Sequence, residues 1–185
     1  LLYALIYMPW FCYLEKRQTI HYIIHSPLDD YIPFVEYFIV PYLLWFIFLA
    51  VTGAYFFFTN RRDFYRLAAF LCSGMTIFLV VYNIFTNLVR MVYSIDTPTN
   101  VLPSIHVYNS IGAMAAIAHS DSLKKHRGIQ ISSYVLGFLI ILSTVFLKQH
   151  SITDVIAAFA MACMIYPFVY ATQEKKAAKF SQQLI

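Results

Sequence analysis

Residues 37–58 read YFIVPYLLWFIFLAVTGAYFFF, an apolar stretch without a charged side chain. A helix needs about 20 predominantly apolar residues to cross the hydrocarbon core of a bilayer, so this segment is long enough to span a membrane. Other apolar runs separated by short polar breaks repeat the pattern. We therefore predict an all-α integral membrane protein, a single domain over residues 1–185 built as a bundle of six transmembrane helices. The predicted spans are residues 1–14, 37–58, 64–82, 104–119, 129–147 and 151–171.

The overall composition supports the same class. The chain is 61% hydrophobic and only 12% charged, whereas an average soluble domain is about 45–50% apolar and about 25% charged. This composition excludes intrinsic disorder and argues against a soluble enzyme. A net charge of +4 spread over so apolar a chain makes no basic face, so we expect no nucleic-acid partner. The three cysteines are scattered and match neither a disulfide framework nor a metal-binding spacing.

The distribution of basic residues predicts the orientation. Nine of the 13 Lys and Arg residues lie after predicted spans two, four and six, including the C-terminal tail. The positive-inside rule then places both termini in the cytoplasm and the remaining loops outside. We expect the protein in the cell membrane, with its polar clusters on the extracytoplasmic side.

The first polar cluster lies directly before predicted span four. Pro103 suits the first turn of a helix because its missing N–H has no partner to lose there. Ser104 and His106 then fall in the first turn, where free N–H groups and the helix dipole favour an anion such as phosphate. The alternative is a plain helix start, with His106 as an interfacial residue.

The second cluster lies between predicted spans five and six. His150 and Asp154 are four residues apart, so on a helix they would share one face. An aspartate bonded to one ring nitrogen leaves the other nitrogen able to attack or to accept a proton. Because Asp154 begins an apolar span, its charge is costly and points to a function. The same spacing recurs at His25 and Asp29, but Pro27 lies between them, and we expect a plain loop there.

The two clusters resemble the motifs of the type 2 phosphatidic acid phosphatase (PAP2) superfamily. Residues 103–106 (PSIH) resemble its P-S-x-H motif, and residues 143–154 (STVFLKQHSITD) resemble its S-R-x5-H-x3-D motif. The resemblance implies a six-helix membrane fold and phosphoester chemistry without a metal or other cofactor. It also implies that the partner is a lipid phosphate substrate held among membrane lipids.

The resemblance also implies a role for each matching residue. His150 would be the nucleophile that forms a phosphohistidine, and Asp154 would orient it. His106 would protonate the leaving alkoxide and then activate water. Ser104 and Ser143, with the N–H groups that begin span four, would hold the phosphate oxygens.

Two departures from the family pattern concern cations. Thr144 stands where the family has arginine, and Lys148 and Arg90 are the basic residues that we assign to substrate binding beside it. The family's first motif, K-x6-R-P, is absent. Because span three ends at 82 and the next segment starts at once, we hypothesise that a basic loop is missing from this sequence near residues 82–83. The sequence also begins with Leu1 rather than Met, so we expect further residues before it.

These features predict a membrane lipid phosphatase that hydrolyses a phosphomonoester or pyrophosphate through a phosphohistidine intermediate. The first alternative is a lipid phosphotransferase resembling the inositol-phosphorylceramide and sphingomyelin synthases, which also lack the arginine that Thr144 replaces. The second alternative is an inactive family member or a transporter, because intramembrane His and Asp also serve as proton relays.

Overall fold

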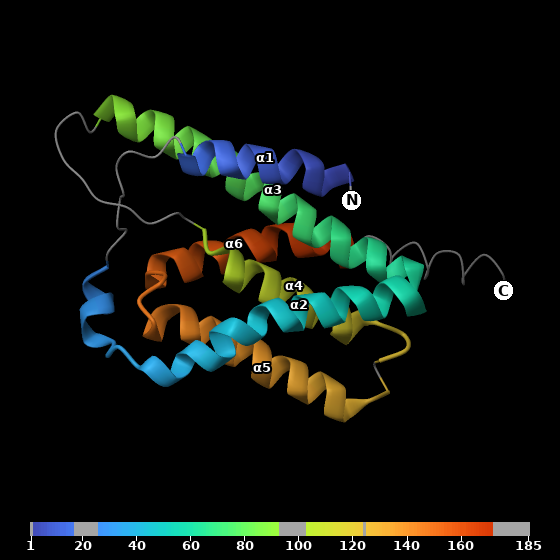
Figure 1. The fold of residues 1–185 in the computed structure, drawn as a ribbon. Helices are drawn as coiled ribbons and strands as arrows, with labels where there is room; N and C mark the ends of the chain where they lie inside the picture. The colour runs from blue at the N-terminus through green and yellow to red at the C-terminus, as the bar shows by residue number, and fades with distance from the viewer. Residues whose placement is uncertain (1, 17–25, 93–102, 124, 172–185) are drawn as a thin grey trace.

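The computed structural model describes residues 2–16, 26–92, 103–123 and 125–171. Within these ranges the regular structure is entirely helical, as predicted (Figure 1). The elements are α1 (Leu2–Lys16), η1 (Pro27–Tyr31), η2 (Glu36–Phe38), α2 (Ile39–Thr59), α3 (Arg61–Val92), α4 (Ile105–His119), α5 (Arg127–Phe146), α6 (Ile152–Tyr166) and the π-helix η3 (Pro167–Ala171).

Four helical stretches are long and apolar enough to cross a membrane. They contain few charged residues and leave most of their side chains outside the protein core, as expected of surfaces that face lipid. Helices α1 and α4 have 15 residues each, which is shorter than a full crossing needs. The count of six spans and the orientation of the termini therefore stay predictions. The four long stretches are Glu36–Thr59, Arg61–Val81, Arg127–Phe146 and Ile152–Tyr170.

Helix α3 differs from the prediction at its C-terminal end. The predicted span ended at residue 82, but α3 continues to Val92 without interruption. Residues 83–92 contain neither Gly nor Pro, so the fall in hydropathy does not end the helix. Because α3 passes through residues 82 and 83 as one helix, the hypothesis of a loop missing there gains no support from the fold.

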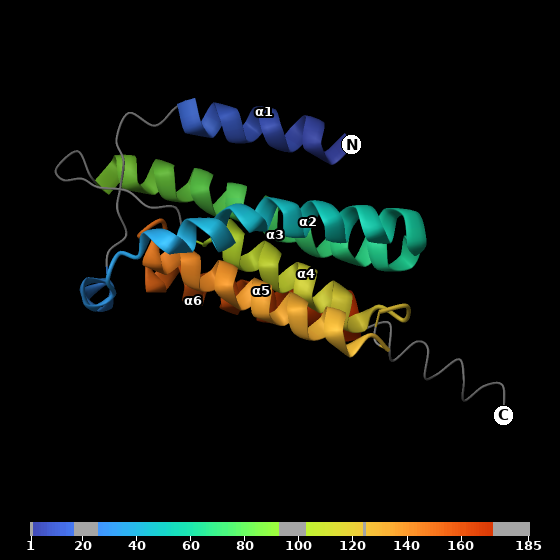
Figure 2. The same cartoon turned by 60° about the horizontal axis from the view of Figure 1, so that its bottom comes forward.

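Helix α4 forms the centre of the bundle and packs against α2, α3, α5 and α6. Small residues on α4 let its neighbours approach closely. Its buried Tyr108 ring stacks on Phe70 of α3, with ring centroids 4.7 Å apart, and its hydroxyl donates to the Phe70 carbonyl at 2.8 Å. A Cβ on Gly74 would overlap the Tyr108 ring, so glycine is required there. Helix α1 lies at the edge of the bundle, beside α3 (Figure 2).

Helices α4 and α6 run side by side in the same direction. At their N-terminal ends the Ser104 N–H donates to the Asp154 carbonyl at 3.3 Å. At their C-terminal ends the Tyr166 hydroxyl and His119 Nε2 are 2.9 Å apart. We call the end of the bundle at which α4 and α6 begin the polar end. It is defined by Ser104, Asp154 and the residues bonded to them. The start of α2 and the end of α5 also lie there, since residue 35 donates to the carbonyl of residue 146.

Candidate active site at the polar end

His150 is held in the turn that joins α5 to α6. The N–H groups of Gln149 and His150 both donate to the Thr144 carbonyl, at 3.0 Å each. Lys148 has a φ of 55°, a left-handed conformation that costs a non-glycine residue free energy. This turn places His150 immediately before Ser151, the N-cap of α6.

Asp154 bonds to His150 across the helix cap. Its Oδ2 lies 3.2 Å from His150 Nδ1 and accepts the Ser151 N–H at 3.2 Å, which completes a capping box. The spacing correctly indicated this pair, but His150 precedes the helix instead of sharing a face of it. Asp154 is 0% exposed, and the His150 side chain is 16% exposed. The contact at Nδ1 leaves His150 Nε2 as the nitrogen able to meet a substrate.

His106 lies in the first turn of α4, next to His150. The two ring centroids are 5.8 Å apart. Tyr42 of α2 stacks on the His106 ring at 4.8 Å, and Trp45 packs on it at 4.4 Å. These aromatic contacts fix the plane of the imidazole. The structure thus brings together the two histidines that the sequence placed at separate span ends.

Ser104 is the N-cap of α4, so the helix begins at Ile105, slightly later than the prediction that placed Ser104 within its first turn. Its hydroxyl oxygen accepts the Val107 N–H at 3.4 Å, and its side chain is fully buried. Its main chain is tied to Asp154, so the start of α4 and the start of α6 move as one unit. Ser104 therefore positions His106 relative to His150.

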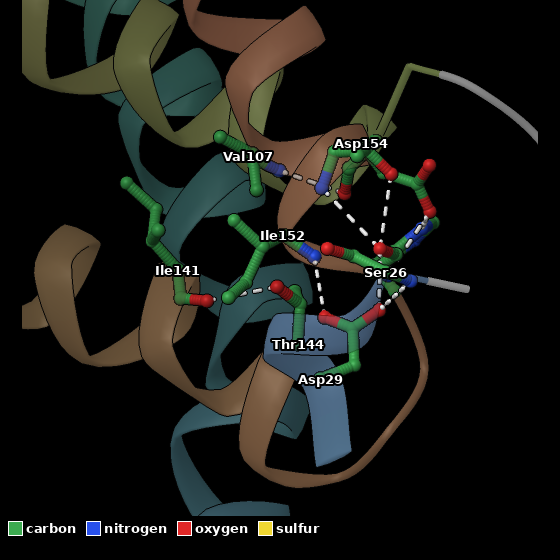
Figure 3. A network of polar contacts seen from close by, with 11 residues as sticks. Ser26, Asp29, Val107, Ile141, Thr144, Ile152 and Asp154 are labelled. Atoms are coloured by element: carbon green, nitrogen blue, oxygen red, sulfur yellow. Dashed lines mark hydrogen bonds and ion pairs between the residues drawn. The ribbon is translucent and has the colours of Figure 1, made fainter. Parts of the chain in front are cut away.

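Ser143 and Thr144 direct their hydroxyl protons into α5. Ser143 donates to the Ile140 carbonyl at 2.6 Å. Thr144 donates to the Ile141 carbonyl at 2.8 Å (Figure 3). Both side chains are fully buried. With their protons so used, neither hydroxyl is a donor for a phosphate oxygen in this arrangement.

The two cations that the sequence suggested have different positions. Lys148 is exposed at the polar end, and its ammonium group donates to the main-chain carbonyl of Asp29. Arg90 belongs to α3, near its C-terminal end, and its side chain lies outside the described residues. Of the two predicted cations, Lys148 is therefore the one that the structure places at the polar end, two residues before His150 in the sequence.

Asp29 is the site residue that the sequence did not indicate. Its Oδ1 accepts the Ile152 N–H at 3.0 Å, and its Oδ2 accepts the Ser151 hydroxyl at 2.6 Å and the Ser26 N–H at 2.8 Å (Figure 3). The side chain is 7% exposed. The sequence analysis noted the spacing of His25 and Asp29 but assigned it to a plain loop, and neither that spacing nor the Ser-Pro-x-Asp capping pattern of η1 reveals a partner 122 residues away.

Asp29 and Asp154 together occupy the N-terminus of α6. Asp154 takes the Ser151 N–H, while Asp29 takes the Ser151 hydroxyl and the next N–H. Negative charge is favourable at a helix N-terminus. Since two carboxylates already lie at the start of α6, a phosphate group is better accommodated at the start of α4.

The site is built from carboxylates, imidazoles and helix N–H groups. Among the described residues, no group of three or more His, Cys, Asp and Glu side chains is arranged to hold a metal ion. An imidazole oriented by a carboxylate, with a second imidazole beside it, suits nucleophilic attack combined with acid–base catalysis.

Comparison with known proteins relates part of the chain to a family. Residues 89–178 match the family model of the PAP2 superfamily, and the match includes His106, His150 and Asp154. No curated protein and no solved structure matches the chain.

Proposed function

We propose that the chain, in which residues 89–178 match the family model of the PAP2 superfamily, is a membrane lipid phosphatase that hydrolyses a phosphomonoester or pyrophosphate through a phosphohistidine. The observation that supports this most is the His150–Asp154 contact at 3.2 Å with the His106 ring beside it. Two rings 5.8 Å apart are close enough to contact the two sides of one phosphoryl group.

The proposed reaction has two displacement steps. The lone pair on His150 Nε2 forms a bond to phosphorus while the bond from phosphorus to the lipid oxygen breaks. Protonated His106 gives its proton to the departing oxygen. Neutral His106 then takes a proton from water, and the water oxygen attacks phosphorus, breaks the P–N bond and releases inorganic phosphate. Asp154 holds the Nδ1 proton and stabilises the positive ring throughout.

The phosphate oxygens would be held at the start of α4. The N–H groups of its first turn and the helix dipole favour an anion there. Lys148 would add a cation, and Arg90 is the second candidate. Ser104, Ser143 and Thr144 stay proposed as substrate-binding residues, a role that requires their hydroxyls to turn from their present partners.

The proposed orientation places this site on the extracytoplasmic side of the cell membrane. The support is the asymmetry of charge, since nine of 13 basic residues belong to the other side. The lipid head group would then reach His150 from the outer leaflet.

A lipid phosphotransferase is the second candidate, and Thr144 is the observation that favours it. Its side chain is fully buried and bonded to the Ile141 carbonyl, where the family's phosphatases have an arginine. Without that cation the charge developing on the phosphoryl group is less well stabilised. The chemistry at His150 is the same, and a lipid hydroxyl replaces water in the second step.

The test of the function is phosphate release by the purified chain from a panel of lipid phosphates with EDTA present. We expect release of inorganic phosphate that does not depend on added divalent metal. Product analysis with diacylglycerol or ceramide as acceptor then separates the two candidates. A phosphorylated acceptor supports transfer, and activity that requires a divalent metal contradicts both.

Asp29→Asn tests whether the hydrogen bonds of Asp29 to Ser151 and Ile152 help to position His150. The change removes a buried charge that binds both Ser151 and the start of α6, so His150 loses its fixed position. Misplacing a catalytic group by about 1 Å can lower the rate by about 100-fold, so we expect kcat to fall by about 10- to 100-fold. KM is expected to change little, because the carboxylate does not contact the substrate. Steady-state kinetics with a soluble short-chain lipid phosphate measures both constants.

The matched control is Asp30→Asn, which changes the adjacent exposed carboxylate. We expect its kcat to stay within about two-fold of the unmodified chain, as for most surface changes. Equal losses in the two variants would show that Asp29 has no specific role in positioning His150.

A further inference from the structure

A pocket of about 370 Å³ opens at the end of the bundle opposite the polar end. Four of its residues recur at helical spacing along one face of α3, and two come from η3, which continues α6. The volume falls within the range of small-ligand sites. The lining residues are Arg62, Tyr65, Arg66, Ala69, Phe168 and Val169.

Among the described residues, the pocket lining contains two arginines and no acidic side chain. The side chain of Arg66 is only 12% exposed, and its Nη1 lies 3.6 Å from Asp63 Oδ1. The Asp63 carboxylate also accepts a hydrogen bond from Asn60 at 2.9 Å, so it is shared between two partners. Arg62 lies one turn before Arg66 and is exposed. Arg66 is thus ion-paired with Asp63, and the exposed Arg62 adds the positive charge that this pair does not balance.

The rim of the pocket is aromatic and apolar. Phe168 is 80% exposed, and Tyr65 is also exposed. Exposed aromatic rings at the ends of membrane helices suit the level of the lipid head groups. Ala69 and Val169 continue the lining as apolar surface. A ligand that fits all of these residues combines an anionic group with a hydrocarbon part.

The location of the pocket agrees with a lipid ligand. The start of α3 and the end of α6 lie at the end of the bundle away from the start of α6 (Figure 1). Tyr166, just before η3, bonds to His119 at the C-terminal end of α4, whereas His106 begins that helix. The pocket thus lies at the end of the bundle opposite the candidate active site, and in a membrane crossed by these helices it would be at the level of the other leaflet.

We propose that this pocket binds the phosphate group of an anionic phospholipid. The planar guanidinium groups of Arg62 and Arg66 match a phosphate in charge and geometry. An acyl chain would lie against Phe168 and the apolar surface of α3. Basic pockets between transmembrane helices at the cytoplasmic side are suited to such head groups. This site is separate from the proposed phosphatase activity and does not depend on it.

The test uses the purified full chain in neutral detergent, titrated with dioleoyl phosphatidylglycerol or dioleoyl phosphatidylcholine and read by native mass spectrometry. Phosphatidylglycerol is a phosphodiester, so it is anionic without being a phosphomonoester substrate for His150. We expect phosphatidylglycerol to bind more tightly than phosphatidylcholine. Arg62→Gln should weaken phosphatidylglycerol binding by about five-fold, the effect of one basic residue near an anionic head group.

The matched control is Arg61→Gln, because Arg61 is the adjacent exposed arginine and does not line the pocket. We expect it to change binding by less than about two-fold, as a surface change away from the site. Equal effects of the two variants, or equal binding of the two lipids, would overturn the proposal. Displacement of phosphatidylglycerol by millimolar inorganic phosphate would also overturn it, by showing that the site recognises a free anion.

Discussion

Replacing His150 with alanine is expected to lower kcat for phosphate release by at least about 1,000-fold, as loss of a nucleophile does in other covalent mechanisms. The change removes the nitrogen that would bond to phosphorus. The fold should survive, because the His150 side chain is partly exposed and its main-chain bond to Thr144 remains. Release of phosphate from a lipid phosphate, measured with EDTA present, gives the comparison.

His126→Ala is the matched control for this prediction. His126 is the N-cap of α5, is exposed and makes no side-chain capping bond. Its replacement should leave kcat within about two-fold. If His150→Ala keeps activity comparable to His126→Ala, His150 is not the nucleophile and the proposed mechanism is wrong.

Asp154→Asn is expected to have the next largest effect, a fall in kcat of about 100- to 10,000-fold, as for a carboxylate that orients a catalytic histidine. The amide is nearly the same size, and its oxygen can still accept the Ser151 N–H. It lacks the charge that stabilises the positive His150 ring, and in the other amide orientation, with the NH2 group in the place of Oδ2, both the Ser151 N–H and the Nδ1 hydrogen lose their acceptor.

Thermal unfolding separates this effect from loss of the helix cap. Asp154 is part of the α6 capping box, and loss of a cap costs roughly 0.5–2 kcal/mol. We therefore expect a lower Tm with most of the protein still folded at the assay temperature. A folded Asp154→Asn variant with full activity would contradict the role assigned to the carboxylate.

The sequence was most informative about the helices, because the position of a helix depends mainly on residues that are close together in the chain. The predicted spans 37–58, 129–147 and 151–171 agree within a few residues with α2, α5 and the continuous run of α6 and η3. Each is an apolar run with polar residues at its ends, and apolar length alone identifies such a helix. The predicted span 64–82 ends within one residue of the apolar stretch Arg61–Val81, and α3 continues beyond it to Val92 because residues 83–92 are less apolar yet contain no helix breaker.

The candidate site likewise contains residues that the sequence indicated and one that it did not. The pairing of His150 with Asp154 was predictable because four residues separate them, although the bond forms across the α6 cap instead of along a helix face. The proximity of His106 followed from the predicted topology. Asp29 was not predictable, because its bonds to the start of α6 depend on how the segment before α2 packs against that helix. Nothing in the local sequence specifies such a long-range contact.

The phosphohistidine is tested most directly by trapping it. The purified chain and its His106→Ala, His150→Ala variants would be mixed with a radiolabelled lipid phosphate, quenched in alkali and separated from lipid. We predict label on the unmodified chain and none on His150→Ala. His106→Ala should gain label more slowly, because it lacks the acid for the leaving oxygen, and should lose it more slowly after a chase with unlabelled substrate, because it lacks the base for water. The bond should be stable in alkali and cleaved in acid, as expected of a phosphoramidate. Label that persists on His150→Ala, or full phosphate release by that variant, would contradict the account.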